Sequence, residues 1–285
     1  MFQRRTSGSV VCPSCGNLVG VRDDKCYICG RANPGLWGFG PALRILGSDF
    51  GFAPFVIGVS SILYVLSLIA SGSELGVLRG GFNILSPSTR ALILFGASGS
   101  IPVFALGSWW TVLSATWLHG GLLHIFFNMY WVRTLGPETA DVIGPARTVI
   151  VYVLSGVCGF LLSSFMGYIE LTSIPFLRGA SVTIGASASI FGLLGALAQY
   201  GRISGSSLIR GQATQYALIL FLFGFIMPGV DNYAHAGGFA GGYVVSALLS
   251  PLARERGDHM IIAAVCLIAT AAAIAMSIVT GLAFY

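Results

Sequence analysis

Apolar runs long enough to cross a lipid bilayer recur along the whole chain. A helix needs about 20 apolar residues to span the hydrocarbon layer. Such runs lie at 52–70, 120–137, 148–168, 181–200, 213–229, 233–250 and 260–283. The apolar segment 91–118 is interrupted by Gly99, Pro102 and Gly107, which suits a partly embedded loop better than an eighth span. The pattern predicts an all-α polytopic membrane protein with seven transmembrane helices.

The charges agree with this prediction and orient the chain. Charged residues make up 9% of the 285 residues, too few to coat a soluble protein. With the N-terminus inside, the inner segments carry Arg4, Arg5, Arg22, Lys25, Arg31, Arg44, Arg133, Arg147, Arg202, Arg210, Arg254 and Arg256. The outer segments carry only Arg79, Arg90 and Arg178. This positive-inside bias predicts a multi-pass cell-membrane protein with a cytoplasmic N-terminus and an outer C-terminus.

The same distribution explains the net charge of +5. The basic residues mark topology and contact the inner leaflet of the lipid bilayer, so no nucleic-acid partner is needed. A cleavable signal peptide is not expected, because the first 50 residues lack a continuous apolar stretch.

Two CxxC turns near the N-terminus, Cys12/Cys15 and Cys26/Cys29, are separated by ten residues. Four thiolates at this spacing predict a tetrahedral structural zinc site. A segment as short as 1–35 cannot bury enough core to fold alone, so the metal is expected to supply folding energy. Iron remains the alternative metal. Disulfides are disfavoured because the charge bias places the segment in the reducing cytoplasm.

The rest of the chain divides by composition. Residues 36–51 are rich in Gly and Pro and predict a flexible linker that leaves the head free of the helices. The helical core is expected at 52–250, with a further helix in 251–285. Cys158 and Cys266 lie in apolar runs, where they are expected to pack.

Four polar residues stand out inside the apolar runs, namely His119, His124, Ser187 and His235. Such groups are costly in hydrocarbon and usually mark a functional site. Ser187 is flanked by small residues, and Gly238 and Gly242 lie on the helix face of His235.

Small residues let two membrane helices approach closely. Close packing of the His235 helix on Gly185, Ala188, Gly192 and Gly195 would bring the imidazole within reach of Ser187, a pairing that activates a serine nucleophile. The alternatives are a serine bonded to its own helix and a buried structural histidine.

His124 and Asn128 are four residues apart and share a helix face, while His119 is expected at the membrane mouth. Donors aimed at one point can stabilise an oxyanion. A catalytic metal is disfavoured because His119 and His124 are five apart with no carboxylate nearby. The alternative is that these polar groups only bond between helices.

Two further residues are candidates that we set aside. Ser98 lies in a literal GxSG sequence, but no helix is expected to follow it and no histidine is expected at its depth, so it is given no catalytic role. Asp231 is four residues before His235, at the exposed end of a loop. We expect it to cap a helix and not to complete a triad.

Three motifs together resemble the rhomboid family of intramembrane serine proteases. These are WWxxLxxxxLHGGxxHxxFNM from Trp109, GASxxxFG from Gly185 and DNxAHxGGFxGG from Asp231, and the resemblance covers about residues 90–250. It implies a six-helix core with a Ser-His dyad at Ser187 and His235, and no cofactor for catalysis.

The resemblance also assigns supporting roles. It implies an oxyanion hole of His124, Asn128 and the nucleophile's backbone N–H, an aromatic stack of Phe191 on the imidazole, and a loop held by His119. Gly185 and Gly238 complete the supporting set.

Two positions depart from the family pattern. Ala188 replaces the last glycine of GxSG, which would narrow substrate choice or slow acylation. Thr111 replaces an arginine, so the loop before the second span is expected to lose its polar anchor. The four-cysteine head and the seventh helix are additions to the six-helix core.

The sequence thus predicts an intramembrane serine endopeptidase that cleaves single-span membrane proteins near the outer face. The alternative is a catalytically inactive rhomboid-like adaptor that binds client membrane proteins. Such adaptors typically lack the serine or the histidine, and both are present here. A proton-coupled transporter is disfavoured because neither inverted repeats nor broken midplane helices are visible.

Overall fold

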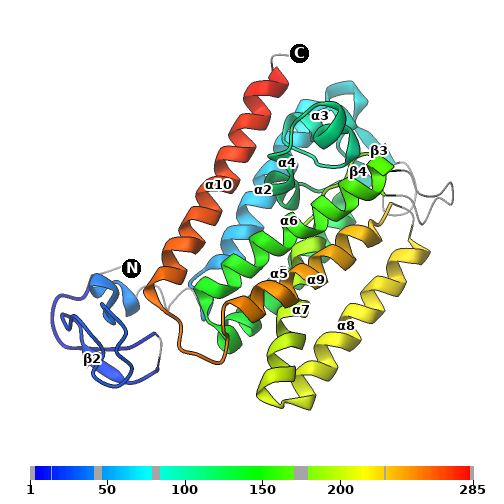
Figure 1. Cartoon of the computed structure of the whole chain (residues 1–285). Helices are drawn as coiled ribbons and strands as arrows, with labels where there is room; N and C mark the ends of the chain where they lie inside the picture. Colours follow the sequence, from blue (N-terminus) through cyan, green and yellow to red (C-terminus); the bar gives the residue numbers. More distant parts are fainter. Residues whose placement is uncertain are drawn as a thin grey trace.

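The computed structural model describes residues 4–13, 15–41, 47–78, 84–169, 179–227 and 229–282. The predicted topology markers Arg44, Arg79 and Arg178 lie outside these residues, as does residue 283 of the last apolar run. In the described part of the chain, a bundle of long helices stands beside a small N-terminal head (Figure 1).

Each of the predicted apolar runs corresponds to one long helix. The helices are α2 (Phe52–Ser71), α5 (Leu122–Ile143), α6 (Pro145–Ile169), α7 (Ser187–Ser204), α8 (Ser207–Ile226), α9 (Asn232–Leu248) and α10 (Gly257–Leu282). The all-α class and the seventh, C-terminal helix are therefore confirmed.

Four of the described helices are long and apolar enough to cross a membrane, namely α6, α8, α10 and α2 with its following turn. The other three long helices do not meet this criterion, and α9 is with 17 residues the shortest of them. Helix α7 packs against α5, α6, α8 and α9, and most of its residues are buried. A helix surrounded by protein does not need a lipid-compatible surface, so small and polar residues are tolerated there.

The segment 91–118 does not form a single span. It folds into α3 (Thr89–Leu94), a π-helical turn η3 (Ile101–Ala105), α4 (Thr111–Ser114) and a 3₁₀ turn η4 (Ala115–Trp117). An antiparallel pair, β3 (Gly76–Leu78) and β4 (Ile84–Ser86), precedes it, after the 3₁₀ turn η2 (Gly72–Glu74). The prediction of a non-spanning connection is confirmed, although the connection is built from short helices.

The head is a two-stranded hairpin of β1 (Ser9–Val11) and β2 (Leu18–Gly20), followed by the 3₁₀ turn η1 (Leu36–Gly38). Among the described residues of the head, the core contains Val10, Val19 and Val21 together with cysteines of the two CxxC turns. So few apolar side chains cannot stabilise a fold alone.

The head packs against the start of α10 (Figure 1). The Arg254 guanidinium donates to the Ile28 carbonyl at 3.1 Å, and Arg31 donates to the Met260 sulfur at 3.0 Å. Arg31 is only 7% exposed. These contacts contradict the free head that the linker glycines predicted; residues 42–46 of that linker lie outside the described part.

Candidate active site

Helix α7 begins at Ser187 itself, with Ala186 as its N-cap residue. The preceding residues are extended: the Thr183 backbone pairs with Ser98, with N···O distances of 2.7 and 3.0 Å, and the Gly185 N–H donates to the Ala115 carbonyl. Gly185 has φ +122°. The predicted start of this helix at 181 is therefore wrong, because β-branched residues favour an extended chain and Gly185 breaks the helix.

This correction changes the chemistry available to Ser187. The predicted run at 181–200 would put Ser187 well inside a helix, whereas it lies in the first turn. First-turn N–H groups have no intrahelical acceptor, and the helix N-terminus carries partial positive charge. The backbone at Ser187 therefore favours negative charge on an oxygen bound next to it.

The helix that carries His235 packs on α7 through backbone contacts. A Cβ added at Gly238 would meet the Ala188 carbonyl, and one added at Gly242 would meet the Gly192 carbonyl. Gly195 lies in the same way against the Phe239 carbonyl. The predicted small-residue interface is confirmed, except that Gly185 precedes the helix and faces His124.

The His235 side chain is 6% exposed and lies one turn before Gly238. Its ring stacks on Phe191 with centroids 4.2 Å apart and an interplanar angle of 14°. Because Phe191 is one turn after Ser187 on α7, this stack brings the imidazole to the N-terminal end of α7, where Ser187 lies. The expected aromatic partner of the imidazole is confirmed.

His124 approaches Ser187 from α5. Its Nδ1 accepts the Gly120 backbone N–H at 3.2 Å, so a neutral imidazole carries its proton on Nε2. A Cβ at Gly185 would lie 2.7 Å from His124 Nε2 and 3.8 Å from Ser187 Oγ. The Nε2–H donor of His124 and the Ser187 hydroxyl therefore border one small space, which the absence of a side chain at residue 185 keeps open.

Asn128 and His119 both lie next to His124. The Asn128 amide donates one N–H to the His124 carbonyl at 2.8 Å, and its side chain is buried. His119 is fully buried, with its ring centroid 5.2 Å from that of His124. His119 is therefore a packing partner of His124 inside the protein, close to the start of α5.

The two departures from the family pattern have local structural explanations. The Ala188 methyl is fully buried in an apolar cluster with Phe160 and Ala234, and a Cβ at Gly159 of α6 would collide with it. Glycine at 159 thus makes the room that alanine at 188 requires. The Ala188 methyl therefore packs against α6 and α9.

Thr111 retains a polar anchor in the loop before α5. Its hydroxyl donates to the Ser108 carbonyl at 2.7 Å and lies 3.5 Å from Ser98 Oγ. The neighbouring Trp110 Nε1 donates to Ser277 Oγ on α10 at 3.1 Å. The expected loss of anchoring is therefore wrong, because hydroxyls and the added C-terminal helix hold this loop.

Ser98 and Asp231 have the surroundings of structural residues. Ser98 is fully buried, with its Oγ 3.4 Å from Ser164 Oγ. Asp231 caps α9 by accepting the Ala234 N–H at 3.0 Å, which confirms the predicted cap. It is half-buried, not exposed as expected, and it also accepts from Ser163 and Thr183, contacts that the sequence analysis missed.

The four cysteines of the head converge on one point. Their sulfur atoms lie within 4.8 Å of one another, with 3.7 Å between Cys12 and Cys29 and 3.6 Å between Cys15 and Cys26. A tetrahedron with Zn–S bonds of about 2.3 Å has edges of about 3.8 Å. The residues present therefore fit a four-thiolate metal site.

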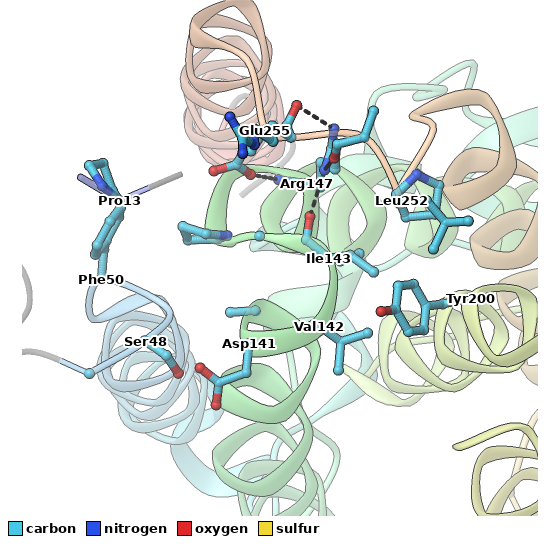
Figure 2. A pocket seen from close by; sticks show the side chains of 17 residues that line it. Pro13, Ser48, Phe50, Asp141, Val142, Ile143, Arg147, Tyr200, Leu252 and Glu255 are labelled. Atoms are coloured by element: carbon cyan, nitrogen blue, oxygen red, sulfur yellow. Dashed lines mark hydrogen bonds between the residues drawn. The ribbon is translucent and has the colours of Figure 1, made fainter. Parts of the chain in front are cut away.

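Figure 2 shows a solvent-accessible cavity of about 640 Å³ beside the turn that joins α5 to α6. It is bounded by the ends of α5 and α7, the loop before α10 and Pro13 of the head. Tyr200 lines it and follows Ser187 by 13 residues on α7, roughly 20 Å along the axis. None of the predicted catalytic residues lines this cavity, so it is not the catalytic pocket.

The cavity wall is held by a buried pair. Glu255 accepts the Arg147 backbone N–H at 2.9 Å, and the Arg147 guanidinium donates to the carbonyls of Ile143, Ala253 and Arg254 (Figure 2). Burial raises the pKa of Glu255 although both arginines nearby, Arg31 and Arg147, lower it. These contacts join the α5–α6 turn to the start of α10, where the head packs.

A family model, the rhomboid domain, matches residues 106–252, which is more than half of the chain. The chain belongs to the rhomboid family. It is accordingly a multi-pass membrane protein, and the matched residues include every proposed member of the Ser187 site.

Curated relatives agree with the family. RHOMBOID-like protein 4 of Arabidopsis thaliana is 32% identical over 170 residues, which cover 58% of this chain and 40% of that protein. Rhomboid protease GluP of Bacillus subtilis is 31% identical over 190 residues, 65% of this chain and 35% of that protein. Inactive RHOMBOID-like protein 8 of Arabidopsis is 32% identical over 136 residues, 46% and 35% respectively. The matches thus cover less than half of each of these relatives.

Proposed function

We propose that this chain is an intramembrane serine endopeptidase that uses Ser187 and His235 to cleave transmembrane segments of single-span proteins. One observation carries the proposal. Ser187 is the first residue of α7, its hydroxyl borders the same small space as His124 Nε2, and the helix of His235 packs on the next residue, Ala188. A relative named as a rhomboid protease supports the same reaction.

The proposed reaction begins when the His235 imidazole takes the proton of Ser187 Oγ. The oxygen attacks the substrate carbonyl carbon, and the carbonyl oxygen becomes an oxyanion. His124 Nε2–H, the second N–H of Asn128 and first-turn N–H groups of α7 stabilise that oxyanion. The protonated His235 then donates its proton to the leaving amine, and water hydrolyses the acyl-enzyme by the same steps. No catalytic cofactor is required.

The proposed arrangement in the membrane follows the charges. The head (1–35) and linker (36–51) lie in the cytoplasm, the protease core (52–250) spans the cell membrane, and 251–285 supplies the seventh helix. Ser187 then opens toward the outer side, where an unwound substrate segment can present its carbonyl. The head binds a structural zinc ion.

The second candidate function is an inactive adaptor that binds client membrane proteins, since one relative is named as inactive. A serine-directed fluorophosphonate probe distinguishes the two. The native chain and Ser98→Ala should be labelled in detergent, whereas Ser187→Ala should not. Labelling that disappears in Ser98→Ala but persists in Ser187→Ala would move the nucleophile to Ser98, and no labelling of the folded native chain would favour the adaptor.

Asn128→Ala tests the oxyanion hole. Losing one preorganised donor should lower kcat by about 10–1000-fold, with little effect on folding because, among the described residues, the amide bonds within its own helix only. Hydrolysis of a detergent-soluble transmembrane substrate measures kcat, and thermal unfolding serves as the control. An unchanged kcat would make Asn128 a packing residue only.

The zinc site should lose its metal in mild acid. Burial raises the pKa of Cys15, but hydrogen bonds from Asn17 and its cysteine neighbours outweigh burial and lower the pKa to about 6. Because the pKa of Cys15 is lowered, its thiolate stabilises the folded head. This stabilisation is fully present above the ordinary pKa of 9.0 and is lost as the pH falls through about 6. A chromogenic chelator should therefore report one zinc per chain released below about pH 6. Retention at pH 4 would contradict this assignment.

A further inference from the structure

The Asp231 carboxylate joins three segments of the site. Its Oδ1 accepts the Ala234 N–H of α9 at 3.0 Å. Its Oδ2 accepts Ser163 Oγ of α6 at 2.5 Å and Thr183 Oγ1 at 2.7 Å. A helix cap needs only the first of these bonds. The other two reach across the bundle and have no capping purpose.

The bonds to Ala234 and Thr183 each hold the segment that leads to one residue of the proposed dyad. Ala234 directly precedes His235, so the cap defines the first turn of α9 from which the imidazole projects. Thr183 is four residues before Ser187 and lies in the extended stretch that leads into α7. The backbone of Thr183 is also paired with Ser98. Oδ2 therefore links the entry of α7 directly to the entry of α9.

We propose that Asp231 is a positioning residue that sets the distance between Ser187 Oγ and the His235 imidazole. The inference rests on the proposed protease function. The nucleophile and the base lie on different helices, and misplacing reacting groups by about 1 Å can cost about 100-fold in rate. Hydrogen bonds to a carboxylate are stronger than those between two neutral groups. Such bonds are suited to holding the beginnings of α7 and α9 at a fixed separation.

Asp231 performs this role without acting as a triad member. His235 Nδ1 is buried and has no hydrogen-bond partner among the described residues. The carboxylate oxygens are instead engaged by Ala234, Ser163 and Thr183. The side chain thus acts on the proposed dyad indirectly, through Ala234 in the first turn of α9 and Thr183 just before α7.

The experiment distinguishes the helix cap that Asp231 forms at Ala234 from the bonds by which it joins α9 to Ser163 and Thr183. Serine caps helices as well as aspartate, but its side chain is too short to reach Ser163 and Thr183. Asp231→Ser, Thr183→Val and the double variant are compared with the native chain. Thr183→Ser restores the hydroxyl. Thr214→Val is the matched control, because that hydroxyl bonds only to the Arg210 carbonyl on an exposed part of α8.

Each single variant should lower kcat by about 10–100-fold and change KM by less than about threefold. The double variant should be no worse than Asp231→Ser alone, because that substitution already removes the bond to Thr183. Thr183→Ser should recover most of the rate, and Thr214→Val should match the native chain. Additive losses, a change confined to KM, or native rates in Thr183→Val would overturn the proposal.

A second readout does not depend on activity. Amide hydrogen exchange should rise in 181–187 when Asp231 is changed, and in 232–236 when Thr183 is changed. If the native chain neither cleaves substrate nor labels at Ser187 but exchange rises reciprocally, the joining role stands and the protease function fails. If the native chain is active and exchange stays local to each substitution, the joining role is wrong and the protease function stands.

Discussion

Replacing Ser187 by alanine should reduce peptide-bond cleavage by about 10³-fold or more while the chain remains folded. The attacking oxygen is removed, and the oxyanion donors alone give little catalysis. Alanine has a high helix propensity, so the first turn of α7 should persist. Cleavage of a labelled transmembrane substrate in detergent, followed to the limit of detection, measures the loss.

His235→Ala should give a loss of similar size, and Ser187→Ala/His235→Ala together should be hardly worse than either alone, because the two groups act as a unit. Ser98→Ala is the matched control. Multiplicative losses in the double variant, or a native rate in either single variant, would contradict the assignment of the dyad.

Gly238→Val should nearly abolish activity and also lower stability. The new side chain would occupy the position of the Ala188 carbonyl, directly beside the nucleophile. Overpacking typically costs about 1–3 kcal/mol, and backbone atoms of a packed helix have little room to move. Helices α7 and α9 must therefore separate, which withdraws the imidazole from Ser187.

Ala240→Val provides the control for this prediction. Residue 240 is on the exposed face of the same helix, so the added methyl groups meet no protein. Its activity and thermal midpoint should stay near those of the native chain. Equal losses in both variants would show that valine disturbs α9 itself, and not the contact with α7.

The apolar periodicity was sufficient to find every long helix, because burial in lipid or in a helical bundle leaves a clear pattern in residue type. It failed at the start of α7, where Val182, Thr183 and Ile184 are as apolar as helix residues. Their extended conformation depends on pairing with Ser98, a residue far away in the sequence. Local sequence cannot report a partner that only folding brings near.

The candidate site divides in the same way. Ser187, His235, His124 and Asn128 could be named from the sequence because polar groups within apolar runs are rare and costly. The buried position of His119 could not, nor could the accommodation of Ala188 by Gly159. Both depend on how neighbouring helices pack at the scale of one methyl group.

The sequence by itself determined the class of the protein, its family and the residue types of its proposed chemistry. Only the tertiary structure decided that Ser187 begins its helix, that the four-cysteine head packs against α10, and that Asp231 bonds to both helix entries. The reason is physical: periodicity and composition are local properties, whereas hydrogen bonds such as those of Asp231 to Thr183 and Ser163 join residues 48 and 68 positions apart.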